Sequence, residues 1–162
     1  MTTDHDDRLF ADETPPEAAS SLPPWKVLVV DDEDDVHAVT RLVLSGFRFA
    51  GRPLELLHAR SAAEAEGLLD LHLDLAVVLL DVVMECDDAG LRLVRYIRET
   101  LQNRAVRIIL RTGHPGQAPE RQVMESYEIN DYREKTELTT TRLYASLTSS
   151  LRSFQQICEL DR

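Results

Sequence analysis

The pattern of apolar and polar residues predicts strands and helices that alternate along most of this sequence. Five apolar segments of strand length, rich in β-branched residues, predict strands at 25–30, 54–59, 74–84, 105–110 and 129–134. Apolar residues at helical spacing predict helices at 36–51, 61–69, 90–101, 117–127 and 138–160. The second of these helices begins with a capping box, in which Ser61 is followed by Glu64.

This alternation predicts the fold class. Parallel strands joined by helices cross over right-handedly, and the helices then cover both faces of the sheet. We therefore predict an α/β fold with a doubly wound, five-stranded parallel sheet and five helices in three α/β/α layers. The run Asp74–Met84 is apolar apart from its first residue and one further carboxylate, Asp81, near its C-terminal end. Such a run is typical of a strand that is buried on both faces and carries an acid to the sheet edge.

Composition indicates one folded domain with acidic segments. The chain has 162 residues, 43% of them apolar, which suits a single core. The net charge of −11 is concentrated in residues 1–24 and 31–35, each of which carries −5. The first segment also holds four prolines and predicts a disordered leader. We expect the folded domain at 25–157, and at 158–162 the end of the last helix and the start of a connector.

The same composition excludes several classes of protein. Direct nucleic-acid binding needs clustered Lys and Arg, which this acidic chain lacks. Its apolar runs are shorter than the roughly 20 residues of a membrane helix, and its N-terminus does not resemble a secretory signal. We therefore expect a cytoplasmic location and no membrane contact. The two cysteines, Cys86 and Cys158, lack the spacing of a disulfide framework or a zinc site.

Five polar residues are expected to meet at one edge of the sheet. Parallel strands end at the same edge, so Asp31, Asp32, Asp81, Thr112 and Lys135 converge there from four strands. Three carboxylates suit Mg²⁺, which prefers a few carboxylates together with phosphate and water. A lysine and a hydroxyl can bind the oxygens of a phosphoryl group. The set therefore predicts phosphoryl transfer.

Residues 25–157 resemble the receiver domains of two-component response regulators. The shared elements are the acidic pair Asp31-Asp32 after the first strand, Asp81 after the third, Thr112-Gly113 after the fourth and Asp131-Tyr132-Arg-Glu-Lys135 after the fifth. The resemblance implies a flavodoxin-like strand order 2-1-3-4-5, with the site between strands one and three.

The resemblance also implies the roles of the acids. Asp81 would be the phosphoacceptor. Asp32, Asp81 and the backbone carbonyl of Val83 would bind Mg²⁺, or Mn²⁺ in its place, and Asp31 would act on the metal mostly through water.

The phosphate-binding and switch roles follow from the same resemblance. Lys135 would pair with the phosphoryl group, Thr112 would move to hydrogen-bond it, and Tyr132 would change rotamer as the readout. Val83 and His114 occupy positions that tune access of the hydrolytic water in this family.

The partners implied are those of a signalling domain. A histidine kinase or a phosphotransfer protein would supply the phosphoryl group, and the fourth helix, fifth strand and fifth helix would form a homodimer face. An output domain is expected beyond Arg162, and the chain looks similar to receivers that precede cyclic-di-GMP phosphodiesterases of the HD-GYP type. No HD motif occurs in these residues.

Two departures from the family pattern concern the loops around the site. Glu85 replaces the proline that commonly follows the methionine of the third loop, and Thr136 replaces the proline after the lysine. A cis peptide before Thr136 would cost about 3 to 4 kcal/mol without proline, so we expect a trans bond or a strained one.

Other interpretations remain open from sequence alone. Asp31 and Asp32 are also suited to capping the first helix, and Tyr132 to packing at a strand edge. The altered loops favour a receiver-like interaction module that takes no phosphate. A phosphohydrolase with an aspartyl nucleophile is opposed by the lack of a second acid after Asp81, and flavin binding by the lack of a phosphate loop after the first strand.

Overall fold

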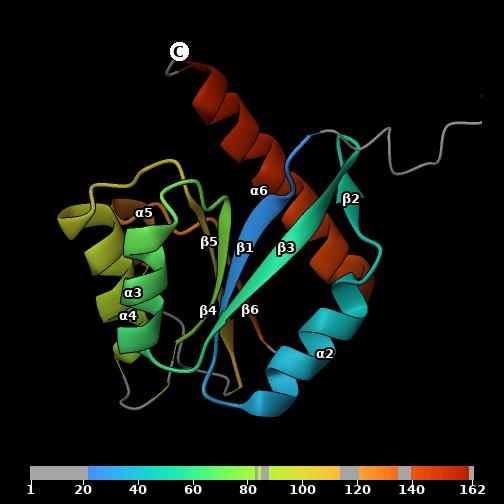
Figure 1. The fold of residues 1–162 in the computed structure, drawn as a ribbon. Coiled ribbons are helices and arrows are strands. Elements are labelled where there is room, and N and C mark those ends of the chain that lie inside the picture. Colours follow the sequence, from blue (N-terminus) through green and yellow to red (C-terminus); the bar gives the residue numbers. More distant parts are fainter. Residues whose placement is uncertain (1–21, 83, 85–87, 114–120, 135–139, 161–162) are drawn as a thin grey trace, which may run out of the picture.

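The computed structural model describes residues 22–82, 84, 88–113, 121–134 and 140–160. A six-stranded sheet in the order β2-β3-β1-β4-β5-β6 runs through its centre (Figure 1). The strands are β1 (Trp25–Val30), β2 (Arg48–Phe49), β3 (Arg52–Ala59), β4 (Val77–Asp81), β5 (Arg107–Thr112) and β6 (Asp131–Glu134). The last five pair in parallel in the order β3-β1-β4-β5-β6, which confirms the predicted 2-1-3-4-5 arrangement.

The strand count and the end of the first helix were predicted wrongly. The helix ends at Leu44 instead of near residue 51, and β2 pairs antiparallel with β3 at the sheet edge. Gly46 has a φ of +83°, a left-handed conformation that ends helices. Ala50 and Gly51 also have positive φ values, 53° and 76°, as a two-residue hairpin turn requires.

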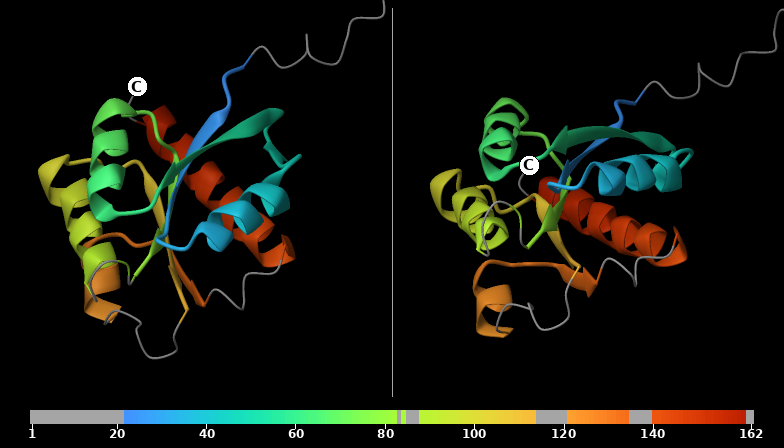
Figure 2. Two further views of the ribbon diagram at one scale, coloured as in Figure 1. Left: turned by 60° about the horizontal axis from the view of Figure 1, so that its bottom comes forward. Right: turned by 90° about the horizontal axis from the view of Figure 1, so that it is seen from below.

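The helices form two layers on either side of the sheet. They are α2 (Asp34–Leu44), α3 (Ala62–Leu71), α4 (Ala89–Arg95), which continues into the π-helical η2 (Tyr96–Thr100), α5 (Arg121–Ser126) and α6 (Thr140–Leu160). Figures 1 and 2 show α2 and α6 on one face and α3, α4 and α5 on the other. The predicted three-layer α/β/α architecture is therefore confirmed. No helix among the described residues is both long and apolar enough to cross a membrane.

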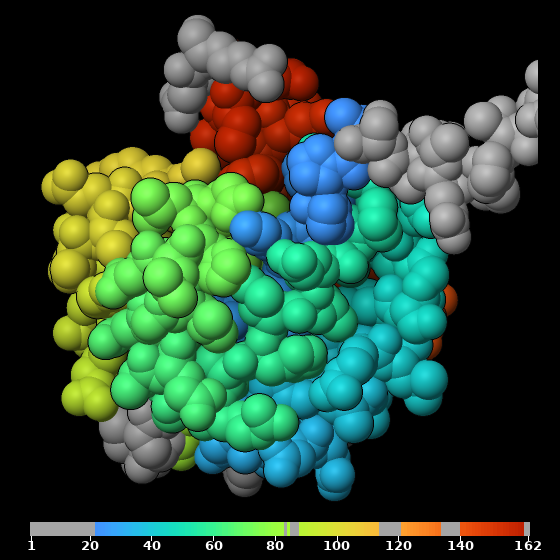
Figure 3. Space-filling model, viewed as in Figure 1, coloured from blue at the N-terminus to red at the C-terminus, as the bar shows by residue number. Residues whose placement is uncertain are grey.

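Each face of the sheet has its own hydrophobic core. On β1, Val27 and Val29 pack toward α2 and α6, whereas Leu28 and Val30 pack toward α3 and α4. This alternation follows from the two-residue period of a strand. β4 and β5 are buried along their whole length, as their continuous apolar runs predicted. β3 lies near the edge and is less buried, and Figure 3 shows its side chains at the surface between α2 and α3.

Several predictions concern residues outside the described ranges. These include the leader up to residue 21, the start of the fourth helix, and the peptide bond between Lys135 and Thr136. The described part of that fourth helix, α5, covers Arg121–Ser126, and α6 begins at Thr140 and reaches Leu160.

Candidate functional site

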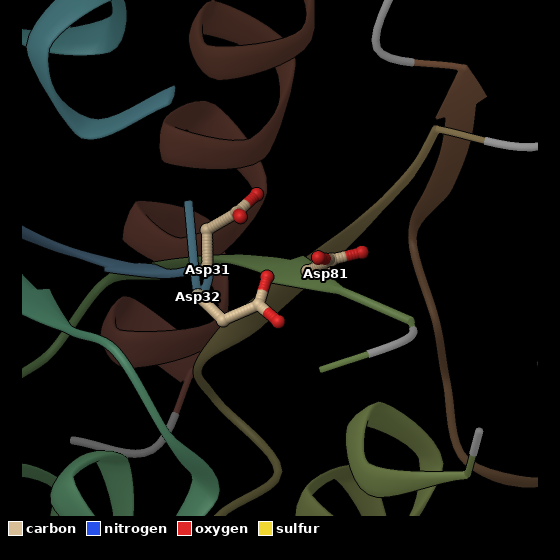
Figure 4. Close-up of side chains that lie close together, drawn as sticks. All are labelled: Asp31, Asp32 and Asp81. Atoms are coloured by element: carbon tan, nitrogen blue, oxygen red, sulfur yellow. The ribbon is translucent and has the colours of Figure 1, made fainter. Parts of the chain in front are cut away.

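Three carboxylates meet where β1 and β4 end. Asp31 and Asp32 follow β1 directly, and Asp81 is the last residue of β4. One carboxylate oxygen of each lies within 4.8 Å of the others, and Figure 4 shows the three side chains gathered at this edge. Asp31 and Asp81 are buried and Asp32 is exposed. Three oxygen donors with one open side match what a hard divalent cation requires, so the donor set fits Mg²⁺.

Backbone hydrogen bonds fix Asp31 at this edge. Its N–H donates to the carbonyl of Ala59 on β3 over 3.1 Å, which extends the β1–β3 pairing by one residue. Its carboxylate Oδ1 accepts a hydrogen bond of 2.9 Å from the N–H of Glu33. The chain can therefore turn into α2 while the Asp31 side chain stays buried beside Asp81.

Two contacting histidines, one on α2 and one on β3, hold the backbone of Asp31 in place. His37 on α2 is buried, and its Nε2 lies 2.7 Å from the Asp31 carbonyl oxygen. Because a carbonyl can only accept, this Nε2 carries a proton. Nδ1 of His37 lies 2.7 Å from Nδ1 of His58, so the two rings share a hydrogen bond. Burial and the neighbouring His37 lower the pKa of His58 to about 4. Sequence reasoning found no role for these two histidines because their contact depends on the packing of α2 against β3.

Gly90 also contributes to the site, although the sequence alone indicated only that it begins a helix. Its N–H donates to the carbonyl of Val82 over 3.1 Å. A Cβ at this position would lie 2.4 Å from the backbone oxygen of Asp81 and 2.8 Å from Cα of Val82. Only glycine therefore allows α4 to approach the end of β4 this closely. The only sequence feature that could have indicated this close packing is a glycine at the start of the predicted helix after the Asp81 loop.

Arg111 also lies at the site, and its role there was not predicted from the sequence. It is buried on β5, directly opposite Asp81 in the parallel register of β4 and β5. Its carbonyl accepts a hydrogen bond of 3.1 Å from the N–H of Val82. From sequence it was only the residue before Thr112, because a strand pattern does not show which strand lies alongside.

The remaining predicted site residues are only partly described. Thr112 is fully buried as the last residue of β5, one position beyond the partner of Asp81. Tyr132 on β6 packs against the core between the sheet and α3, and its buried hydroxyl has no hydrogen-bond partner in the described chain. Lys135, Val83 and His114 lie outside the described residues, so their roles stay predictions.

Charges on the predicted dimer face pair within the chain in this structure. Arg121 lies 3.3 Å from Glu125 along α5, and Arg133 lies 3.2 Å from Asp131 along β6. Asp131 also accepts a hydrogen bond of 3.0 Å from the Ser146 hydroxyl on α6. The homodimer stays a prediction.

Comparison with known proteins finds a sequence relative that is much longer than this chain. No protein-family model matches the sequence. The chain is 54% identical over 141 residues to a 3'3'-cGAMP-specific phosphodiesterase 2 of Vibrio cholerae, a match that covers 87% of this chain but 27% of that protein. The chain thus spans about a quarter of the length of this curated relative.

Solved structures give the fold. A response regulator receiver domain from Clostridium thermocellum superimposes with a TM-score of 0.68 at 21% identity, over 82% of this chain and 98% of that one. The signal receiver domain of an HD domain-containing protein from Pseudomonas fluorescens gives a TM-score of 0.70 at 21% identity, over 86% and 96% of the two chains. The chain has the fold of response regulator receiver domains.

Proposed function

We propose that this chain is a Mg²⁺-dependent receiver domain that accepts a phosphoryl group on Asp81. The observation that carries the proposal is the carboxylate cluster of Asp31, Asp32 and Asp81, located where β1 and β4 end in a receiver-type fold. The sequence alone favoured the same chemistry, and the described geometry brings these three acids together. The chain is then a regulatory domain and not a stand-alone catalyst.

The chemistry asks little of the protein beyond placement. A carboxylate oxygen of Asp81 attacks the phosphorus of a phosphohistidine, an O–P bond forms, and the P–N bond breaks. The electron pair of that bond stays on the donor imidazole, which leaves as a neutral ring after taking up a proton. Bound Mg²⁺ would neutralise charge on the phosphoryl oxygens, and Asp31 and Asp32 would hold it beside Asp81.

Readout of the phosphoryl group is assigned to residues on the next two strands. Thr112 would donate its hydroxyl proton to a phosphoryl oxygen, and Lys135 would pair with the added charge. Tyr132 would report the change, since its hydroxyl is buried without a partner in the described chain and gains by finding one. A repacked surface of α5, β6 and α6 would carry the signal to a partner or a second copy.

The comparison with the Vibrio cholerae protein suggests the output. That protein is a phosphodiesterase named for 3'3'-cGAMP, and the aligned part is 27% of its length. We extend the proposal to a histidine kinase or phosphotransfer protein as phosphoryl donor, and to a phosphodiesterase acting on a cyclic dinucleotide as the controlled activity.

Intact-mass measurement after incubation with Mg²⁺ and acetyl phosphate tests the central step. The wild-type chain is expected to gain the mass of one phosphoryl group, and Asp81→Asn to gain none. Asp35→Asn is the matched control, because Asp35 is an exposed acid on α2 that is not part of the carboxylate cluster. An unmodified wild type would favour the alternative of an interaction module that takes no phosphate.

A further inference from the structure

Arg111 lies in one row with two of the three acids. In the parallel register Val30 of β1 faces Leu80 of β4, and Asp81 faces Arg111 of β5. The next residue of β1, Asp31, continues this row. Strand residues two positions apart point to the same face, and the residues two positions earlier, Val29, Leu79 and Ile109, all lie in the core beside α2 and α6. Asp31, Asp81 and Arg111 therefore share one face of the sheet, side by side.

The guanidinium of Arg111 is buried with few polar contacts. The residue is 4% exposed, and its Nη1 donates to the hydroxyl of Thr40 on α2 over 3.1 Å. Its Nε and Nη2 are also buried, and neither has a hydrogen-bond partner in the described chain. A buried cation normally forms hydrogen bonds with all its donors, because desolvation is otherwise costly. Within the described residues, something other than hydrogen bonds must therefore stabilise this charge.

The neighbouring carboxylates are the available source. Burial lowers the pKa of Arg111, while the charges of Asp31 and Asp81 act in the opposite direction. The favourable interaction is mutual, since one buried positive charge offsets the repulsion among acids whose oxygens lie within 4.8 Å of one another. The next residue along this row toward the sheet edge, Arg60, cannot serve in this way, because it is exposed and pairs with Asp34.

We infer that Arg111 is a built-in counter-cation of the acidic site, which holds the carboxylates together without metal and weakens the binding of the divalent cation. This inference rests on the proposed function, since it assumes that Mg²⁺ occupies the Asp31, Asp32 and Asp81 cluster. The buried guanidinium repels the incoming cation, and its interaction with the acids must be partly given up when the metal takes their oxygens. The fraction of chains with bound Mg²⁺ then varies with the Mg²⁺ concentration, and saturation needs a higher concentration than it would without the charge of Arg111.

Isothermal titration with Mg²⁺ alone tests the inference without any phosphoryl donor. We expect Arg111→Gln, which keeps polar atoms near Thr40 but loses the charge, to bind Mg²⁺ roughly tenfold more tightly than wild type. Arg111→Lys keeps the charge and should stay within about threefold of wild type. A merely structural role would give the opposite sign, because a damaged site binds metal more weakly. Equal or weaker binding by Arg111→Gln would overturn the inference.

A second measurement covers the case in which Arg111→Gln folds poorly. Denaturation of each variant over a Mg²⁺ series reports the same affinity, because a ligand that binds only the folded chain stabilises it by RT ln(1 + c/Kd), where c is the free Mg²⁺ concentration. Arg111→Gln should gain more stability per added Mg²⁺ than Arg111→Lys, and the reverse order would refute the inference. Asp81→Asn separates the two proposals. If Mg²⁺ binding is unchanged in Asp81→Asn, the proposed metal site itself is wrong, whatever the Arg111 variants do.

Discussion

Two buried arginines at opposite ends of the sheet differ in the number of hydrogen bonds that their guanidinium groups donate. Arg98 on η2 is 5% exposed and lies near the start of β5 and β6. Its guanidinium donates over 2.8 to 2.9 Å to four backbone carbonyls, those of Asn103, Val106, Tyr127 and Glu128. Arg111 at the site end is equally buried, but its guanidinium has one described hydrogen bond, to Thr40.

The difference shows what each arginine is for. Arg98 joins the end of η2 to the loops before β5 and β6, so its charge serves as a fixed set of hydrogen-bond donors. Burial with Arg107 nearby lowers its pKa only to about 10, which leaves it protonated at neutral pH. The guanidinium of Arg111 bonds to no loop among the described residues, and it interacts chiefly through its charge. A satisfied buried cation therefore indicates structure, and an unsatisfied one beside carboxylates indicates a site.

The largest expected effect comes from Arg98→Met. This change leaves four buried or partly buried carbonyl groups without their donor and should lower the free energy of unfolding by about 4 kcal/mol. Chemical denaturation measures the loss. Arg95→Met is the matched control, an exposed arginine of α4 just before η2, and should stay within about 0.5 kcal/mol of wild type.

The same experiment on Arg111→Met completes the comparison. At saturating Mg²⁺ the metal replaces the lost positive charge beside the acids, so we expect a cost of about 1 kcal/mol for the Thr40 hydrogen bond. If Arg98→Met and Arg111→Met destabilised the chain equally under these conditions, the distinction between the two arginines would fail.

Gly90→Ala tests how closely α4 must pack against the end of β4 beside the carboxylate cluster. The added Cβ would lie 2.4 Å from the Asp81 carbonyl oxygen, which belongs to the backbone and cannot rotate away. We expect a loss of about 2 to 3 kcal/mol in unfolding free energy and weaker Mg²⁺ binding, since the end of β4 must shift. Calorimetric titration and denaturation measure the two effects.

Gly67→Ala is the control for this glycine. Gly67 lies inside α3, and no atom lies within 4 Å of an added Cβ. Alanine there should stabilise the chain by about 0.5 to 1 kcal/mol through its higher helix propensity. Stabilisation by both substitutions would show that α4 does not need its close approach to β4.

Local sequence patterns were enough to predict Asp81 and the parallel strands. Asp81 was predictable because a strand buried on both faces is a continuous apolar run, and an acid at its end stands out locally. The parallel sheet followed from the alternation of strands with helices, and the resemblance to receiver domains implied the order of its five parallel strands. β2, with only Arg48 and Phe49, is too short to give a period.

The roles of Arg98 and Arg111 could not be predicted in this way. A charged residue inside a helix or strand pattern predicts an exposed position, and both arginines are buried. The partners of Arg98 lie up to 30 residues away, and Thr40 lies 71 residues from Arg111. Contacts of this kind depend on strand register and helix packing, which local patterns do not contain.

The histidine pair gives the site end a pH dependence. The pKa of His58 is about 4 in the folded chain and near 6.5 when unfolded. Between these values the unfolded chain binds more protons, so folded stability falls as the pH is lowered from 6.5 toward 4. His58→Asn keeps a polar partner for His37 but does not titrate, and should lose less stability over this window in denaturation at each pH. Parallel curves for the two proteins would contradict the assignment.

The smallest expected effect separates the orientation of Arg111 from its charge. Thr40→Val keeps the shape of the side chain but removes the acceptor 3.1 Å from Nη1, which should cost about 1 kcal/mol in unfolding free energy. Because the guanidinium keeps its charge beside Asp31 and Asp81, Mg²⁺ affinity should stay within about twofold of wild type. Thr40→Ser, which restores the hydroxyl, controls for the loss of the hydrogen bond. An increase in Mg²⁺ affinity as large as that of Arg111→Gln would mean that the hydrogen bond, and not the charge, holds the metal off, and the counter-cation interpretation would then give way to one of geometry.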